Sequence, residues 1–452
     1  MKKKHYDVLI VGGGISGSAL LYTLAKYTNV KSLCLLEKYG SLSSLNSKGT
    51  SNSRTIHIGD IETNYTLEKA TATKRTAKMV EKFCLQYSLE NKIMFSHQKM
   101  ALGVGKKEVE FITHRYHEFK HLFPYLELWD VDKLKELEPK VVYSDKAQTK
   151  VRPEPIIAMG TQTQYTTVDY GALSEALVFQ AQESSKSTHT LTDIFYLAQV
   201  DDIEEYNNGK FKVTTKGGEV YTADFVVVNA GAHSLFLAHK MGYGKHMGCL
   251  PMAGSFYMTE SHFLNGKVYM VQNNKLPFAA LHGDPDILAD GKTRFGPTAL
   301  MLPKLERFKP GTYLDFIKTL NFDFKIVKIF WDLLKDSDIR NYIFKNFLFE
   351  VPLINKSLFV QEARKIVPSL EVQEIIYAKG FGGIRPQVLD KSKGKLMLGE
   401  ASINPNNGLI FNMTPSPGAT SCLGNAERDL HIIVKHLGLT YDEVHFLKDL
   451  TE

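Results

Sequence analysis

A glycine-rich turn near the start of the chain constrains the fold more than any other feature. An apolar run at residues 7–11 leads into Gly12-x-Gly14-x-x-Gly17, and residues 18–27 are rich in alanine and leucine. Three glycines would weaken a membrane-anchoring helix, whereas they have a use between a buried strand and a helix. The sequence therefore predicts strand, turn and helix here, with no signal peptide and no transmembrane helix.

Each glycine of this turn has a predicted role in holding a dinucleotide. Gly12 allows the tight turn, Gly14 lets the backbone approach a pyrophosphate, and Gly17 lets the helix pack closely on the strand. The N-terminus of the helix offers N–H groups and a positive dipole end to the phosphates. Residues 32–36 are predicted as a second strand, and it ends at Glu37, which can accept hydrogen bonds from a ribose. One dinucleotide is expected.

Length and composition limit the class of protein. The chain has 452 residues, enough for two or three domains, and 43% hydrophobic with 23% charged residues exclude global disorder. The net charge of +6 is small and is spread along the chain, so no nucleic-acid partner is expected. The four cysteines are far apart, which predicts no metal site and no disulfide framework and favours a reducing cytoplasmic compartment.

Three later motifs could also bring backbone close to a cofactor. The first follows a predicted strand at residues 225–229, and the third opens a final helix. The motifs are Asn229-Ala230-Gly231, Gly383-Ile384-Arg385-Pro386 and Gly418-Ala419-Thr420. Together with the N-terminal turn they resemble the flavoprotein family of D-amino-acid oxidase and glycerol-3-phosphate dehydrogenase.

Four longer blocks resemble the malate:quinone oxidoreductase family more closely, and the resemblance covers nearly the whole chain. The blocks are residues 52–65, 277–286, 293–300 and 411–420. The resemblance implies FAD as the cofactor, oxidation of malate to oxaloacetate, and a membrane quinone as the electron acceptor. Rival activities are the oxidation of another 2-hydroxy acid, such as 2-hydroxyglutarate, or of an amino acid. A flavoprotein that binds RNA would need its basic side chains on one face.

The resemblance also implies an α/β fold with two domains. One is a FAD-binding Rossmann-like domain of the glutathione-reductase type 2, and the other is a mixed-sheet α+β substrate domain. The FAD domain is expected to be discontinuous, at residues 1–95, 150–235 and 370–452. The substrate domain is expected at residues 96–149 and 236–369, with a helical, aromatic-rich insertion at about 305–352.

Malate carries two carboxylates and a hydroxyl, so its site needs cations and a proton acceptor. Histidine suits the second task, and arginine offers carboxylates a bidentate pair of donors. His282 is expected to be the base, while His57 orients the flavin or the substrate. Arg385 and Arg294 are expected to bind the carboxylates, and Lys99 is a further candidate. The alternative for Arg385 is an ion pair with a nearby acid, Asp390 or Glu400.

The cofactor-binding residues follow from the motifs and the resemblance. The start of the last helix would stabilise negative charge on the reduced flavin ring. The residues expected to hold FAD are Gly12, Gly14, Gly17, Glu37, Asn52, Ser53, Ala230, Gly231, Gly383, Gly418, Ala419 and Thr420.

The aromatic and basic stretch at residues 308–349 allows two interpretations. Phenylalanines at helical spacing are usual in a core-facing stripe. The same stretch could instead be a platform on an anionic membrane surface, where the enzyme meets quinone. The second interpretation places the protein peripherally at the cytoplasmic face of the inner membrane.

Overall fold

Apolar strands near the N-terminus build the sheet that positions the cofactor cleft. The computed structural model describes residues 4–206, 209–272, 281–397, 399–415 and 417–452. Residues 277–280 and 416, which belong to two of the blocks quoted above, lie outside the described residues. Five strands run parallel in the order β22-β11-β1-β2-β8. They are β22 (Leu409–Met413), β11 (Val220–Val228), β1 (Lys4–Val11), β2 (Ser32–Leu36) and β8 (Leu191–Phe195).

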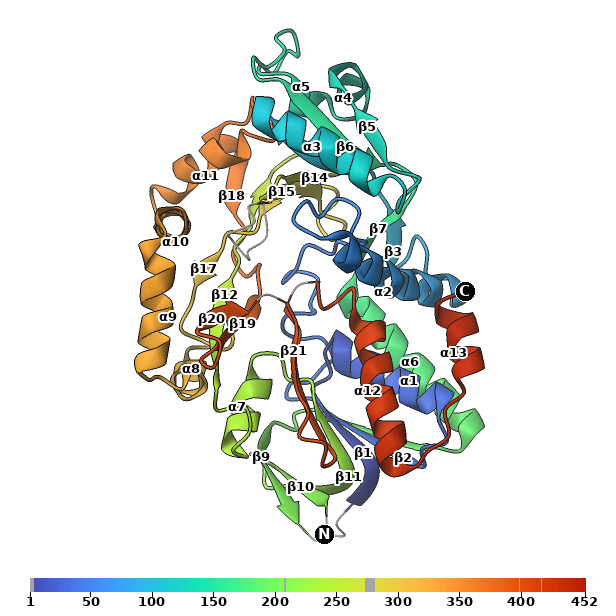
Figure 1. The fold of residues 1–452 in the computed structure, drawn as a ribbon. Helices are drawn as coiled ribbons and strands as arrows, with labels where there is room; N and C mark the ends of the chain where they lie inside the picture. The colour runs from blue at the N-terminus through green and yellow to red at the C-terminus, as the bar shows by residue number, and fades with distance from the viewer. Residues whose placement is uncertain (1–3, 207–208, 273–280, 398, 416) are drawn as a thin grey trace.

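Both faces of this parallel sheet are covered, as apolar strands require. Three helices pack together on one face, on the right in Figure 1: α1 (Ile15–Tyr27), α6 (Tyr170–Thr188) and α12 (Cys422–Leu437). The helices α2 (Leu67–Gln86) and α13 (Glu443–Leu450) lie outside them. The edge strand and an antiparallel hairpin extend the sheet: β21 (Ala401–Ile403), β9 (Val200–Tyr206) and β10 (Lys210–Thr215).

A second eight-stranded sheet of mixed direction forms the upper part of the molecule (Figure 1). Its order is β18 (Ile375–Tyr377), β13 (Tyr257–Thr259), β16 (Thr293–Gly296), β15 (His282–Pro285), β14 (Lys267–Met270), β4 (Lys99–Val104), β6 (Ile156–Thr161) and β5 (Glu127–Trp129). The helices that accompany it are α3 (Lys106–Phe119), α4 (Val131–Leu137), α5 (Pro139–Val142) and α11 (Asn355–Ala363). The sequence prediction of a Rossmann-like sheet with a mixed-sheet partner is confirmed.

Two smaller sheets connect these units. The larger one has the order β17 (Leu300–Met301), β12 (Met247–Ala253), β19 (Ile384–Asp390) and β20 (Lys395–Met397). The other pairs β3 (Met94–Ser96) with β7 (Tyr165–Val168). The short helix α7 (His233–Lys240) follows β11.

The sheets divide the chain differently from the expected domain limits at two places. β6 lies within the expected 150–235 segment of the FAD domain but pairs with β4 and β5. The strands β18, β19 and β20 lie within the expected 370–452 segment but also join the other sheets. Hydrogen-bond partners distant in sequence decide this membership, and hydropathy does not reveal them. The domain limits themselves remain a prediction.

The aromatic stretch forms three helices on the left flank of the molecule, which we call the platform (Figure 1). It consists of α8 (Tyr313–Leu320), α9 (Phe324–Lys335) and α10 (Ser337–Leu348). Two 3-10 turns, Pro310–Thr312 and Val372–Glu374, lie before and after it. Among the described residues, no helix is long and apolar enough to cross a membrane.

Candidate functional site

A cavity of about 650 Å³ lies at the carboxyl ends of the parallel strands, where doubly wound folds bind their ligands. Its wall combines segments that are far apart in the sequence, including both the N-terminal glycine turn and the C-terminal motifs. The expected site residues in the wall are Gly12, Gly14, Glu37, Asn52, Ser53, His57, Ala230, Gly231, Gly383, Arg385, Ala419 and Thr420. Gly17, Gly418, His282 and Arg294 are not among the residues that line the cavity.

The glycine turn can only be built from glycine at two of its positions. Gly12 has a φ of +108°, and a Cβ there would lie 2.4 Å from the carbonyl oxygen of Asn229. A Cβ on Gly17 would lie 1.9 Å from the carbonyl oxygen of Gly12. The turn therefore packs directly against the end of β11, where Ala230 and Gly231 complete the wall.

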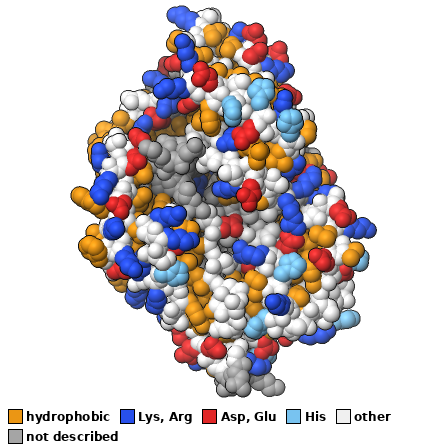
Figure 2. Space-filling view, viewed as in Figure 1, with side chains coloured by type: hydrophobic (Ala, Val, Ile, Leu, Met, Phe, Trp, Pro, Cys, Tyr) orange, Lys and Arg blue, Asp and Glu red, His pale blue; other side chains and the backbone are white. Residues whose placement is uncertain are grey.

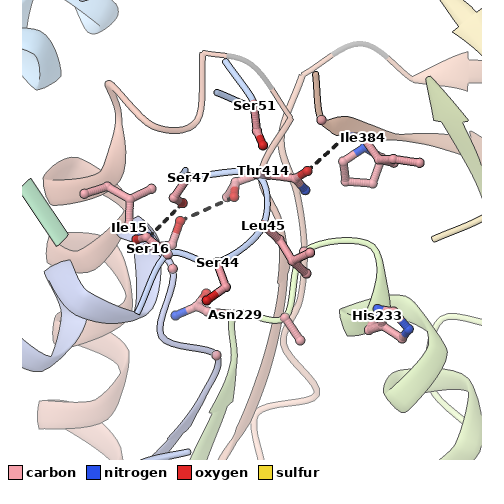
Figure 3. Close-up of a pocket in the computed structure, with 18 of the residues that line it drawn as sticks. Ile15, Ser16, Ser44, Leu45, Ser47, Ser51, Asn229, His233, Ile384 and Thr414 are labelled. Carbon is pink, nitrogen blue, oxygen red and sulfur yellow. Dashed lines mark hydrogen bonds between the residues drawn. The ribbon is translucent and has the colours of Figure 1, made fainter. Parts of the chain in front are cut away.

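The start of α1 presents backbone donors to the cavity. Its N-cap is Gly14, which has no side chain to bond the first N–H groups, and Ile15 donates its N–H to Ser47 Oγ at 3.0 Å. Ser16 Oγ lies 3.4 Å from Thr414 Oγ1, so three distant segments meet here (Figure 3). A helix N-terminus with glycine as its N-cap, facing a cavity, fits a pyrophosphate.

Glu37 lies at the end of β2, as the dinucleotide pattern requires. Its side chain is buried, and its two oxygens accept N–H groups from Gly13 at 2.7 Å and Tyr39 at 2.8 Å. Burial raises the pKa of this carboxyl above its usual value, and the backbone donors oppose that shift. The remaining lone pairs can accept ribose hydroxyls.

His57 and Arg385 also line the cavity. His57 Nδ1 lies 2.7 Å from Glu62 Oε1, and its backbone N–H donates to Thr420 Oγ1 at 3.2 Å. Arg385 stands on β19 beside Gly383, where a Cβ would lie 2.8 Å from Asn46 Oδ1. Burial lowers the pKa of the Arg385 guanidinium from its usual value. A proton acceptor and a cation thus face one space.

His282 and Arg294 do not line the cavity and are held in place by sheet register. His282 lies opposite Tyr269 on the antiparallel pair β14–β15, and their rings stack with centroids 4.3 Å apart. The ring of Tyr269 is in turn 6.3 Å from that of His57. His282 is 1% exposed. Tyr269 therefore lies between the two histidines that the sequence singles out.

Arg294 belongs to a buried charge network centred on Asp284, its cross-strand partner. Asp284 Oδ2 lies 3.0 Å from Arg294 Nη2 and 3.2 Å from Lys267 Nζ. Arg294 also donates to the carbonyl of Asn52 at 3.1 Å, and Lys267 to that of Ser53 at 3.2 Å. Although burial opposes it, the two cations hold the pKa of Asp284 well below its usual value. The network braces the loop that lines the cavity.

Lys99 is fully buried and pairs with Asp60, with Nζ and Oδ1 2.7 Å apart. It does not line the cavity. Arg54, which the sequence analysis left unassigned, does line it, and its buried side chain pairs with Asp286. Glu62 was also missed, although it stands five residues after His57 in the same block. Asn46 and Ser47 also line the cavity. The signal that could have revealed them is their place in a loop, residues 41–53, that is rich in serine, glycine and asparagine and follows the second strand.

Solved structures that align with this chain include oxidases and dehydrogenases of amino acids and glycerol phosphate, two of them with FAD bound. Glycine oxidase from Geobacillus kaustophilus aligns with a TM-score of 0.64 and 15% identity, over 96% of this chain and 95% of the other. L-alpha-glycerophosphate oxidase from Mycoplasma pneumoniae, solved with FAD bound, aligns with a TM-score of 0.63 and 20% identity, over 97% and 96%. These similarities establish the fold.

Sequence comparison is more specific. Residues 4–436 match the malate:quinone oxidoreductase (Mqo) family. A probable malate:quinone oxidoreductase from Campylobacter jejuni is 55% identical over 100% of both chains. The malate:quinone oxidoreductase of Helicobacter pylori is 47% identical over 99% of this chain and 98% of its own. The chain belongs to the malate:quinone oxidoreductase family.

Proposed function

We propose that this protein binds FAD in the cleft and oxidises malate to oxaloacetate, with quinone as the final electron acceptor. The observation that carries the proposal is that one cavity joins the dinucleotide turn to His57 and Arg385. The residues fit FAD, because the glycine turn, the start of α1 and Glu37 all line the cavity. FAD, when bound, supplies the acceptor for the hydride of malate C2.

Arg385 fits a substrate carboxylate because its charge has no protein partner in the part of the chain that the structure describes. Of the two acids considered as ion-pair partners, Asp390 is engaged elsewhere, with Oδ1 2.5 Å from Ser392 Oγ and Oδ2 3.8 Å from Lys393 Nζ, and no ion pair joins Glu400 to Arg385 among the described residues. A half-buried cation without a counter-ion is costly, and a bound carboxylate offsets that cost. Arg385 is therefore assigned to the carboxylate.

His57 is assigned as the proton acceptor because it lines the same cavity as Arg385. His282 stays a candidate base, but Tyr269 separates it from His57. Arg294 supports the site through the carbonyl of Asn52. His57→Ala should lower kcat by roughly 10²–10⁴ with malate still bound. A near-normal rate in that variant, and a slow one in His282→Ala, would return the role to His282.

The direct test of the activity uses purified protein with its flavin spectrum recorded. Malate should bleach the flavin, and quinone should restore its colour, whereas lactate, 2-hydroxyglutarate and glycine should act slowly or not at all. Bleaching by one of these three but not by malate would move the protein to another substrate. A protein that is not yellow would contradict the cofactor assignment.

Arg385→Lys tests the carboxylate site. Lysine keeps the charge but loses the bidentate fork, so KM for malate should rise more than kcat falls. Arg340→Lys, on the exposed side of α10, is the matched control and should leave both constants unchanged with a water-soluble dye. A fall in kcat alone would show that Arg385 acts on the reaction rather than on binding.

We also infer that the platform is the face that docks on an anionic membrane surface, at the cytoplasmic side of the inner membrane. One side of the platform packs into the core through Phe316, Leu320, Ile326 and Ile329. The other side exposes large apolar side chains: Leu314, Ile317, Phe322, Phe324, Val327, Trp331, Leu334, Phe344 and Phe347. One side of the platform is therefore part of the hydrophobic core, and the other is exposed to solvent. Figure 2 shows the mixture of apolar and basic side chains on this flank.

The exposed basic side chains of the platform support anionic lipid as its partner. The apolar residues alternate with exposed cations, Lys318, Lys325, Lys328, Lys335, Arg340 and Lys345. Amphipathic helices with basic rims lie in the lipid headgroup region. Phe324→Ser with Trp331→Ser should abolish sedimentation with anionic vesicles and spare dye-linked malate oxidation. Phe179→Ser, an exposed phenylalanine on α6, is the control. Unchanged vesicle binding would remove the platform from this role.

A further inference from the structure

The two ring nitrogens of His57 have different surroundings. Nδ1 contacts Glu62 Oε1 at 2.7 Å, whereas Nε2 makes no hydrogen bond to any residue within the described ranges. The ring lines the cavity. A neutral imidazole carries one proton, and a carboxylate beside Nδ1 keeps that proton on Nδ1. The lone pair of Nε2 is then available on the side away from Glu62.

Backbone geometry fixes Glu62 in this contact. Its side chain is buried, and Oε2 accepts the N–H of Gly59 at 2.9 Å. Gly59 has a φ of +93°, and a Cβ there would lie 2.9 Å from the carbonyl oxygen of Ala70. The tight turn between His57 and Glu62 therefore depends on glycine and holds both carboxylate oxygens.

The charges around Glu62 keep it ionised. Burial acts to raise the pKa of this carboxyl, but the hydrogen bond from His57 and the positive charge of Lys99 outweigh it, so the pKa lies below its usual value. The other titratable groups facing this pair come from several elements: Asp60 and Tyr125 beside Lys99, Tyr65 and Lys69, Glu400, and the ring of Tyr269.

We propose that Glu62 is a positioning residue that presents Nε2 of His57 to the substrate hydroxyl and stabilises the imidazolium formed there. The inference rests on the proposed function. In the step concerned, the O–H bond of the substrate breaks, its electron pair stays on oxygen, and an N–H bond forms at Nε2. A buried carboxylate at Nδ1 stabilises the resulting cation more than water would.

Two variants of the FAD-loaded protein test the inference. Glu62→Gln removes the negative charge beside His57 Nδ1, and Glu62→Asp keeps the charge but shortens the side chain. Glu62→Gln should lower kcat for malate about 10- to 100-fold and change KM less than about twofold. Its acidic limb in the kcat profile should move to lower pH, because the imidazolium loses its neighbouring negative charge. Glu62→Asp should recover part of the rate. Glu68→Gln, exposed at the start of α2, is the matched control and should behave as wild type.

A double-mutant cycle separates positioning from general loss of structure. In a His57→Ala background, Glu62→Gln should cause no further fall in kcat, because its effect passes through the imidazole. A full additional loss would overturn the inference, as would an unchanged kcat and pH profile in Glu62→Gln. If Glu62→Gln does not retain FAD, the cycle is run with Glu62→Asp. Wild-type protein that malate does not bleach would instead refute the proposed function.

Discussion

At the scale of single residues, the cations of this chain divide into two kinds. Arg294 and Lys267 are buried, both pair with Asp284, and Arg294 also pairs with Asp286; both donate to backbone carbonyls, so they shape the loop at residues 52–53. Arg385 faces the cavity without an ion-pair partner among the described residues. Arg294 and Arg385 are both arginines within motifs that resemble the family. Only the cross-strand pairing of Arg294 with Asp284 distinguishes the two.

Replacing the central acid of the network should destabilise the protein. Asp284→Asn removes the acid paired with buried Lys267 and leaves Arg294 with Asp286 alone, and breaking a buried ion pair typically costs about 3–5 kcal/mol. The free energy of unfolding in urea at pH 7 should fall by roughly that amount. The side chain of Asp224 is partly exposed, so Asp224→Asn is a suitable control.

The pH dependence of this difference has a definite sign. The pKa of Asp284 is lower in the folded state than in the unfolded chain, so its contribution is present above the unfolded value, about 3.9. The contribution is lost as the pH falls from there towards the folded pKa. The gap between wild type and Asp284→Asn should therefore be constant near neutrality and shrink below about pH 4. A gap that widens on acidification would contradict the assignment.

At the scale of elements, local patterns were enough near the N-terminus. The strand expected at 7–11 is the second half of β1, the helix expected at 18–27 is most of α1, and 32–36 is β2. Apolar spacing at residues 81–92 predicts a helix there, but the helix found, α2, ends at Gln86 and begins at Leu67, in a polar, exposed segment without apolar periodicity. Its one local signal is Thr66, whose side chain caps the N–H of Lys69 at 3.2 Å.

The segment that leads into the platform, from Glu306 to Asp315, contacts residues that line the cofactor cleft. Glu306, just before α8, is buried, and its carboxylate accepts hydrogen bonds from Lys38 and Tyr39, which directly follow Glu37. His233 Nε2 lies 3.4 Å from Asp315 of α8. The insertion is therefore tied to the residues next to the ribose acceptor as well as to its own sheet.

Glu306→Gln should accelerate the loss of FAD. The variant removes the charge that holds Lys38 beside the cleft, and losing one charge-assisted contact of about 1.4 kcal/mol corresponds to roughly tenfold faster release. The rise of free-flavin fluorescence after dilution measures this rate. Glu204→Gln, on exposed β9, is the control. Equal rates of release from the wild type, Glu306→Gln and Glu204→Gln would mean that the contact of Glu306 with Lys38 does not retain the cofactor.

At the scale of the whole molecule, the sequence predicts the parts better than their assembly. The glycine turn, Glu37 and the three later motifs could be found because each is a local pattern. The placement of Tyr269 between His57 and His282 could not be predicted, because it arises from the register of β14 against β15. The membership of β6 in the mixed sheet and the burial of Lys99 likewise depend on strand partners far away in the sequence.

The cleft joins the loop after β2 of the parallel sheet to the β19 segment of the four-stranded sheet, and this has a thermodynamic consequence. Asn46 Oδ1 accepts the N–H of Ile384 at 2.9 Å, and Thr50 accepts that of Gly382 at 2.8 Å. The loop after β2 and the β19 segment therefore meet where the cofactor would lie. A ligand that binds there stabilises both units together, because it binds only when they are assembled.

Adding FAD to the apoprotein should therefore raise the melting temperature of one cooperative transition. At a free concentration one hundred times Kd, the expected gain is about 2.7 kcal/mol, and it should increase with the logarithm of concentration. Scanning calorimetry checks both the shift and the number of transitions. FMN lacks the adenosine half that reaches Glu37, so it should produce a smaller shift at equal concentration. Two transitions, only one of which moves with FAD, would show that a single unit holds the cofactor.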